Sequence, residues 1–198
     1  MQDMKILGHA EETSKGIHKI LEKRWSPKSF SGHPIDAGDL RQLFEAARWA
    51  PSCYNAQPWR FIVATREDAD GYNHLLSTLV EPNRQWAQQA PALILAVAKL
   101  DFDHAPKPNR HAYYDLGQSV ANLTVQATAL GLQIHQMGGF DAAAARELFA
   151  IPKGYEAVAV LALGYETNSA EGKSARSRKP LADMVFSGSW GRPASVVL

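Results

Sequence analysis

Residues 50–61 read APSCYNAQPWRF, a stretch that joins a predicted helix to a predicted strand. Pro51 ends the helix that the apolar spacing of residues 40–47 predicts, because proline cannot donate a helical hydrogen bond. Residues 59–65 are rich in aromatic and β-branched side chains, which is typical of a strand. Between the two, Asn55 can close hydrogen bonds to its own backbone. Taken alone, the block therefore indicates a helix stop followed by a turn.

Hydrophobic periodicity predicts further strands and helices on both sides of this block. The predicted strands cover residues 59–65, 92–99, 133–137 and 155–164, and the predicted helices cover residues around 17–24, 36–50, much of 66–90, 113–130 and a short stretch after Asp141. Asp36 and Asp141 are the predicted N-caps of two of these helices. Residues 92–99 are apolar on both faces, so we expect a central, covered strand. Helices come first and then separate the strands, which predicts an α+β fold with a mixed central β-sheet flanked by helices.

The predicted helix at 113–130 is apolar over a wide arc. Its main stripe consists of Leu116, Val120, Leu123, Ala127 and Leu130, and Ala121, Thr124 and Val125 extend it sideways. A helix of this kind must be buried on more than one side, and one small domain does not cover it comfortably.

The composition excludes several classes of protein. The chain has 198 residues, 45% of them apolar, which is enough for one folded domain with a sizeable core, and its net charge of +1 argues against nucleic acid as a partner. Cys53 is the single cysteine, so no intramolecular disulfide or multi-cysteine metal site can form, and no histidines have the spacing of a zinc motif; we expect no metal. The apolar run at 91–98 is too short to span a membrane as a helix. The charged N-terminus lacks a secretory signal, so we expect a cytoplasmic protein that does not enter the membrane.

Four blocks, taken together and in this order along the chain, resemble the nitroreductase family. They are RWSPKSF at 24–30, APSCYNAQPWRF at 50–61, MGGFD at 137–141 and RSRKPL at 176–181. The resemblance implies a nitroreductase-like, FMN-dependent fold in which two chains form an intertwined homodimer, with two FMN sites in the interface and each site built from both chains. Residues 1–198 then form one domain, and residues 165–198 are a C-terminal extension that packs on the partner subunit. The wide apolar arc of the 113–130 helix agrees with such an interface.

By the same resemblance, FMN-binding residues lie in all four blocks and at one position between them. These residues are Arg24, Trp25, Ser26, Lys28, Pro51, Ser52, Cys53, Asn55, Asn83, Gln136, Met137, Gly138, Gly139, Arg176 and Arg178. The cationic residues of the first and last blocks suit the FMN phosphate, although the alternative is that both basic segments are simply solvated. Residues 51–55 are expected to contact the flavin from the partner subunit, and Gln57 is expected to brace their loop.

Asn83 and the pair Gly138 and Gly139 have the most specific expected roles. Asn83 corresponds to an amide at the pyrimidine edge of the flavin, and a surface turn is an equal alternative. The glycines let the backbone approach closely, so that an amide N–H can meet flavin N5. Many members of the family have a glutamate where this chain has Gly138. The alternative for the pair is a strand-to-helix turn that needs a positive φ.

The implied activity is that of an oxidoreductase of the ping-pong type. NADH or NADPH delivers hydride to FMN, leaves, and is replaced by a small electron-poor acceptor such as a nitroaromatic or a quinone. No catalytic acid–base side chain is assigned, and Cys53 has no recognisable histidine partner that would make it a nucleophile. Three alternatives stay open: another flavin reaction, such as dehalogenation, enal or aldehyde reduction or flavin fragmentation; a non-catalytic FMN-binding module; and a cofactor-free interaction protein.

Overall fold

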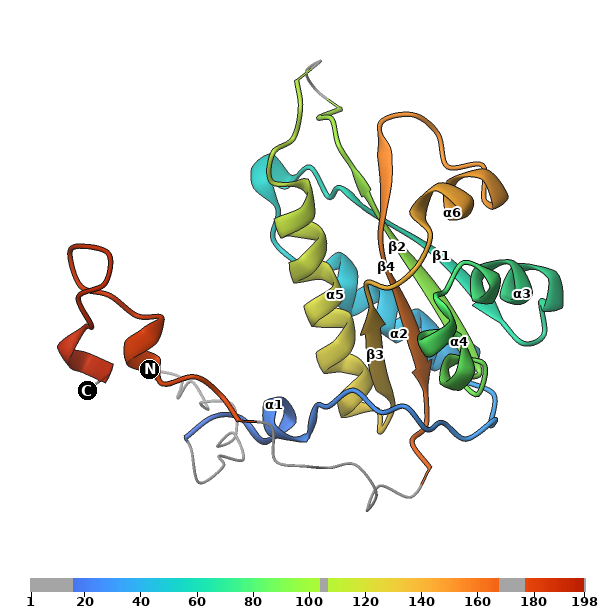
Figure 1. The fold of residues 1–198 in the computed structure, drawn as a ribbon, viewed down its shortest axis with the longest axis horizontal. Helices are drawn as coiled ribbons and strands as arrows, with labels where there is room; N and C mark the ends of the chain where they lie inside the picture. The colour runs from blue at the N-terminus through green and yellow to red at the C-terminus, as the bar shows by residue number, and fades with distance from the viewer. Residues whose placement is uncertain (1–15, 104–106, 168–176, 198) are drawn as a thin grey trace, which may run out of the picture. The chain divides into compact units, whose positions relative to one another are not determined.

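The computed structural model describes residues 16–103, 107–167 and 177–197, which fall into two units with their boundary between residues 167 and 168. The first unit holds α1 (Lys19–Lys23), α2 (Ala37–Arg48), the 3-10 helix η1 (Cys53–Asn55), β1 (Trp59–Thr65), α3 (Ala69–Ser77), α4 (Glu81–Ala87), β2 (Ala92–Lys99), α5 (Ala112–Ala129), β3 (Gln133–Met137), α6 (Ala142–Leu148) and β4 (Tyr155–Gly164), as Figure 1 shows. All four predicted strands are confirmed.

The sheet has the order β1-β2-β4-β3, and its three strand pairs are all antiparallel. The predicted central position of residues 92–99 is confirmed, because β2 lies between β1 and β4. The prediction of a mixed sheet was wrong. After β1 the chain passes through α3 and α4 and enters β2 at the same end of the sheet at which it left β1. There the Arg66 amide donates to the Pro91 carbonyl at 3.2 Å. A chain that re-enters at that end must run antiparallel.

Alternating side chains of the strands pack into two separate cores, one on each face of the sheet. Leu93, Leu95 and Val97 of β2 point to the face covered by α3, α4 and α6. The alternate residues Ala92, Ile94, Ala96 and Ala98 point to the face covered by α2 and α5. The result is a layer of helices on either side of one sheet (Figure 1). The helices that cover β2 and β4 explain why residues 92–98 of β2 and residues 157–163 of β4 are all apolar.

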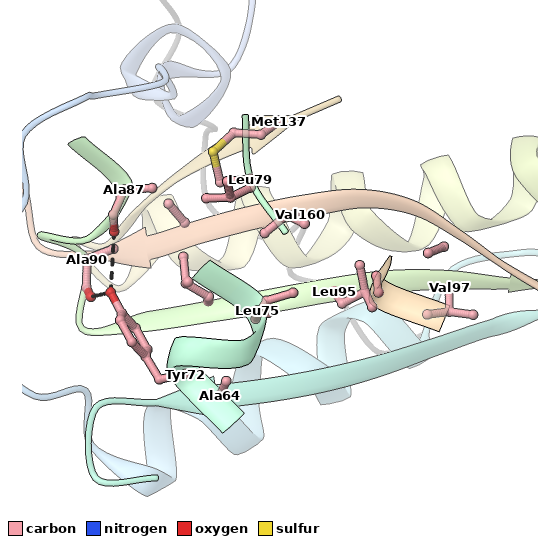
Figure 2. Packing of buried hydrophobic residues seen from close by; sticks show 14 of the residues in the cluster. Ala64, Tyr72, Leu75, Leu79, Ala87, Ala90, Leu95, Val97, Met137 and Val160 are labelled. Atoms are coloured by element: carbon pink, nitrogen blue, oxygen red, sulfur yellow. Dashed lines mark hydrogen bonds between the residues drawn. The ribbon is translucent and has the colours of Figure 1, made fainter. Parts of the chain in front are cut away.

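Tyr72 ties α3 to the end of α4 inside the first of these cores. Its hydroxyl donates to the Ala90 carbonyl at 2.7 Å and to the Ala87 carbonyl at 3.3 Å, which are the dashed lines in Figure 2. Burial raises the pKa of the Tyr72 hydroxyl, and the nearby Arg66 opposes this effect only in part. The bonds fix α4, the helix that carries Asn83.

Two helices begin where the sequence predicts. Asp36 accepts a hydrogen bond from the Gly38 amide at 2.6 Å, and Asp141 accepts from the Ala143 and Ala144 amides at 2.9 Å each. Both aspartates are therefore the N-caps that the sequence indicates.

The helix α5 is covered on one side only within the first unit. Leu116, Leu123 and Ala127 are buried as predicted, but Tyr114 keeps 70% of its surface exposed and Ala121 is also exposed. Most of the arc that the sequence predicts is therefore buried in a single chain, with Val125 and Leu130 half-buried and Ala121 exposed at its edge. No helix in the described part of the chain is long and apolar enough to cross a membrane.

The second unit is described from residue 177 to residue 197. It contains two short 3-10 helices, η2 (Leu181–Asp183) and η3 (Ser195–Val197), and an antiparallel bridge between Phe186 and Pro193. Leu181 and Trp190 keep 56% and 92% of their surface exposed, so this unit buries little of its own apolar surface.

Candidate functional site

The loop that carries the first block lies along β3. The Trp25 amide donates to the Gln133 side-chain oxygen at 3.5 Å, and His135 Nδ1 lies 2.8 Å from the Pro27 carbonyl. Because a carbonyl only accepts, His135 donates here from Nδ1. These contacts at the start and the middle of the strand hold the loop against the sheet.

Arg24 and Ser26 come together in this loop, and Lys28 follows at its surface. Arg24 Nη1 donates to the Ser26 hydroxyl at 3.2 Å, and Arg24 is half-buried. Trp25 Nε1 donates to Glu166 at 2.8 Å, so the polar atom of the indole is used within the chain. Lys28 is exposed and forms no ion pair with any residue that the structure describes. Two cations and a hydroxyl in one fixed loop are suited to an anionic group.

Asn83 meets the backbone that follows β3. Its Nδ2 donates to the Gly139 carbonyl at 3.1 Å, and the Val80 amide donates to the same oxygen at 3.1 Å. A Cβ on Gly139 would lie 2.9 Å from Asn83 Nδ2 and 2.9 Å from Val80 Cγ2. Glycine is therefore needed here for close approach. The alternative of a surface turn at Asn83 is wrong, because Asn83 lies within α4. The alternative of a positive φ is wrong for both Gly138 and Gly139.

Gly138 faces open space instead. A Cβ built on it would meet no heavy atom within 4 Å. Within the described ranges, its amide N–H has no hydrogen-bond acceptor. Met137 beside it is buried in the core (Figure 2), and Gln136 donates through Nε2 to Thr124 of α5 at 3.5 Å. The open feature at this end of β3 is therefore the backbone, not a side chain.

Trp86 and His135, which were not predicted as site residues, pack against each other beside the loop of residues 24–30. The rings of Trp86 and His135 have centroids 4.4 Å apart, and Phe30 stacks on Trp86 at 6.3 Å. Trp86 is buried in the core beneath α3, α4 and α6. His135 carries no sequence signal, because a histidine on a short strand is ordinary until the loop beside it is known.

The second block forms a strained turn. Tyr54, Asn55 and Gln57 have φ values of 50°, 54° and 46°, a region that residues with a Cβ adopt at a cost of about 1–3 kcal/mol each. Gln57 braces the turn as predicted. Its backbone amide donates to the Ser52 hydroxyl at 3.0 Å, and its side-chain Nε2 donates to the backbone carbonyl of Asn55 at 3.2 Å. The block is thus more than a helix stop and a plain turn.

Within the first unit, the second block does not lie with the first and third blocks. The Cys53 amide donates to Asp115 at 3.0 Å, in the first turn of α5, whereas Gln136 contacts Thr124 nine residues later. At a rise of 1.5 Å per residue these points of α5 are about 13 Å apart. Figure 1 shows residues 51–57 in cyan beside the start of α5 and β3 along its later half. The described site residues of the first unit therefore form two groups.

The last predicted block is described only in part. Arg176 lies outside the described residues. Arg178 belongs to the second unit, is exposed, and donates through Nη1 to the Ser177 carbonyl at 3.2 Å. Its expected contact with the same anion as Arg24 stays a prediction.

Comparison with known proteins gives consistent matches over most of the chain. A sequence model described as the nitroreductase family matches residues 21–165. A putative NAD(P)H nitroreductase of Bacillus subtilis, MhqN, is 26% identical over 85% of this chain and 96% of its own length. A putative NADH dehydrogenase/NAD(P)H nitroreductase of Streptomyces coelicolor is 30% identical over 69% of this chain and 76% of its own. A solved structure of an oxidoreductase containing FMN is 30% identical, covers 94% of this chain and all of that chain, and has a TM-score of 0.84.

Proposed function

Because this chain belongs to the nitroreductase family, we propose that it is an FMN-dependent oxidoreductase that passes hydride from NADH or NADPH to a small electron-poor acceptor, such as a nitroaromatic or a quinone. The relatives named as NAD(P)H nitroreductases and the similar FMN-containing structure support this activity. When bound, FMN supplies the acceptance and donation of hydride.

The observation that carries the proposal is the arrangement around β3. The cationic loop with Arg24 and Lys28 contacts the start and middle of the strand, and the open backbone at Gly138 follows its end. FMN has its phosphate and its ring at opposite ends of a ribityl chain, so a cationic loop and an open amide fit the cofactor. Arg24, Ser26 and Lys28 would hold the phosphate, and the Gly138 amide would donate to the ring.

The two separate groups of site residues support a homodimer. Residues 51–57 lie about 13 Å along α5 from the β3 group, and α5 leaves Tyr114 and Ala121 exposed. A second copy packed on this open side would supply its own residues 51–55 to the first copy's β3 group. Each site would then need both chains.

The chain contributes positioning rather than acid–base chemistry. No titratable side chain donates or accepts at Gly138 among the described residues, and Gly138 itself carries none. The contribution of the protein is then to hold the flavin, to leave its reactive face open and to place donors at its edge.

The test is cofactor binding by matched arginine variants. We expect Arg24→Ala to weaken FMN binding at least about tenfold, because it removes a charged donor. Arg178→Ala tests the tail in the same way. Arg41→Ala is the control, because Arg41 is exposed on α2 and belongs to none of the blocks expected to bind FMN. Fluorescence titration of FMN measures the affinities. Equal binding by Arg24→Ala, Arg178→Ala and Arg41→Ala would contradict the assignment of the phosphate site.

Turnover separates an enzyme from an FMN-binding module. The purified protein should show a flavin absorption spectrum that bleaches on anaerobic titration with NADH. It should oxidise NADH in the steady state with menadione or nitrofurazone as acceptor. Bound FMN without turnover would favour the non-catalytic module, and a colourless monomer that does not take up FMN would exclude both. The identity of the acceptor that works best decides among the other flavin reactions.

A further inference from the structure

Three polar side chains of α5 lie along one line of the helix and bind the chain around the second block. They stand at spacings of four and three residues, which places them on one helix face. Their contacts are Asp115 Oδ2 with the Cys53 amide (3.0 Å), Ser119 Oγ with the Ala47 carbonyl (3.0 Å) and Asn122 Nδ2 with the Ala46 carbonyl (3.3 Å). The end of α2 and the start of the strained turn are thus fastened to the same helix.

Asp115 is the member of this line that bonds to the turn itself. Its side chain is almost completely buried, with 2% of the residue surface exposed. A carboxylate in such a place is costly unless a donor compensates its loss of water, and the Cys53 amide is that donor. Asp115 therefore fixes the one backbone group at which the turn begins.

The turn needs such a fixed point. Tyr54 and Asn55, directly after Cys53, have positive φ values of 50° and 54°. A strained backbone persists only where the surrounding contacts hold it. The hydrogen bonds between Gln57 and residues 52 and 55 brace the turn from within. Among the hydrogen bonds of the described residues, the one from the Cys53 amide to Asp115 joins the turn to a long helix.

We propose that Asp115 is a positioning residue of the flavin site: its buried carboxylate holds residues 52–57 in the conformation with which they reach the FMN of the partner subunit. This role rests on the proposed function. It assigns to the site a residue that itself makes no contact with the cofactor.

The plainer role for Asp115 is that of an acidic residue in the first turn of a helix, where a negative charge is favoured by the helix dipole. Asp39 has this role in α2 and makes no contact with the turn. Asp39→Ala is therefore the matched control. Asp115→Asn is the conservative variant, because its carboxamide removes the charge but keeps an oxygen that can accept from Cys53.

The experiment uses the full-length protein and three readouts. Cys53 is the single cysteine, so its reaction rate with Ellman's reagent, measured over a range of pH to separate thiol ionisation, reports on the turn without FMN. FMN affinity and thermal unfolding are the other two. We expect Asp115→Ala to raise the Cys53 rate and to weaken FMN binding by about tenfold each. Asp115→Asn should stay within about threefold of the wild type in both, and Asp39→Ala should change only the unfolding temperature.

Two results would overturn the proposal: an unchanged Cys53 rate and FMN affinity in folded Asp115→Ala, or equal effects of Asp115→Asn and Asp115→Ala. If Asp115→Ala does not fold, hydrogen exchange in the wild type decides, because the Cys53 amide should be protected; an unprotected amide overturns the proposal. A wild type that does not bind FMN would refute the proposed function instead, whereas the Cys53 rate and the exchange would still show whether Asp115 holds the turn.

Discussion

Gly139→Ala should destabilise the protein, whereas Gly138→Ala should not. A Cβ at residue 139 would lie 2.9 Å from both Asn83 Nδ2 and Val80 Cγ2, which is closer than real contacts. Asn83 can rotate away only by losing its bond to the Gly139 carbonyl, and the β-branched Val80 has little freedom to move. Overpacking of this kind costs about 1–3 kcal/mol. For a chain of this size that lowers the unfolding temperature by roughly 2–12 °C.

Gly138→Ala is the matched control because the same methyl group enters open space there. The unfolding temperature should stay within about 2 °C of the wild type. FMN affinity should also stay within about threefold of the wild type, because the methyl group meets no heavy atom within 4 Å and leaves the backbone amide in place. Differential scanning fluorimetry and FMN titration measure the two quantities. A Gly139→Ala protein as stable as the wild type, or a Gly138→Ala protein that is destabilised as much, would refute the reasoning.

Two further predictions concern the elements that support the site. Tyr72→Phe should lower the free energy of unfolding by about 1–2 kcal/mol, because it removes the bonds to Ala90 and Ala87. Because the pKa of Tyr72 is raised in the folded state, its contribution to stability is complete below the ordinary value of 10.0 and is lost as pH rises through the folded pKa. Urea unfolding should therefore show the unfolding free energies of the variant and the wild type converging in strongly alkaline solution. A difference that stays constant with pH would contradict this. Asp141→Ala should remove the N-cap that accepts from the Ala143 amide and lower the free energy of unfolding by about 0.5–2 kcal/mol in the same assay. FMN affinity should be unchanged. An unaltered free energy of unfolding would show that the cap does not stabilise the protein.

Local signals explain why the strands and helix starts could be predicted. The strand at 155–164 is recognised because its apolar run and its bounds depend only on neighbouring residues. Asp141 is recognised as a cap because its side chain reaches amides two and three residues ahead. The direction of the strands carries no such local signal. For β1 and β2 it depends on the end of the sheet at which the chain re-enters after α3 and α4. The hydrogen bond between Arg66 and Pro91 marks that end.

The site residues also differ in whether a local sequence signal marks them. The phosphate-binding role of Arg24 and the flavin-facing amide of Gly138 follow from residue type and from the resemblance of their blocks, and both stay predictions. Asp115 could not be predicted, because an acidic residue in the first turn of a helix is common and its partner, Cys53, lies 62 residues away in sequence. The positive φ of Tyr54 was equally hidden, since no glycine marks the position.

By itself the sequence determined the elements, their buried faces and the residue types able to hold an anionic cofactor, because hydrophobic period, capping and charge are properties of short stretches. Only the tertiary structure decided that the sheet is antiparallel, that Gly139 is needed for close packing and Gly138 is not, and that residues 51–57 lie apart from the β3 group within one chain. These features depend on contacts between residues distant in sequence, and such contacts form only when the whole chain has packed.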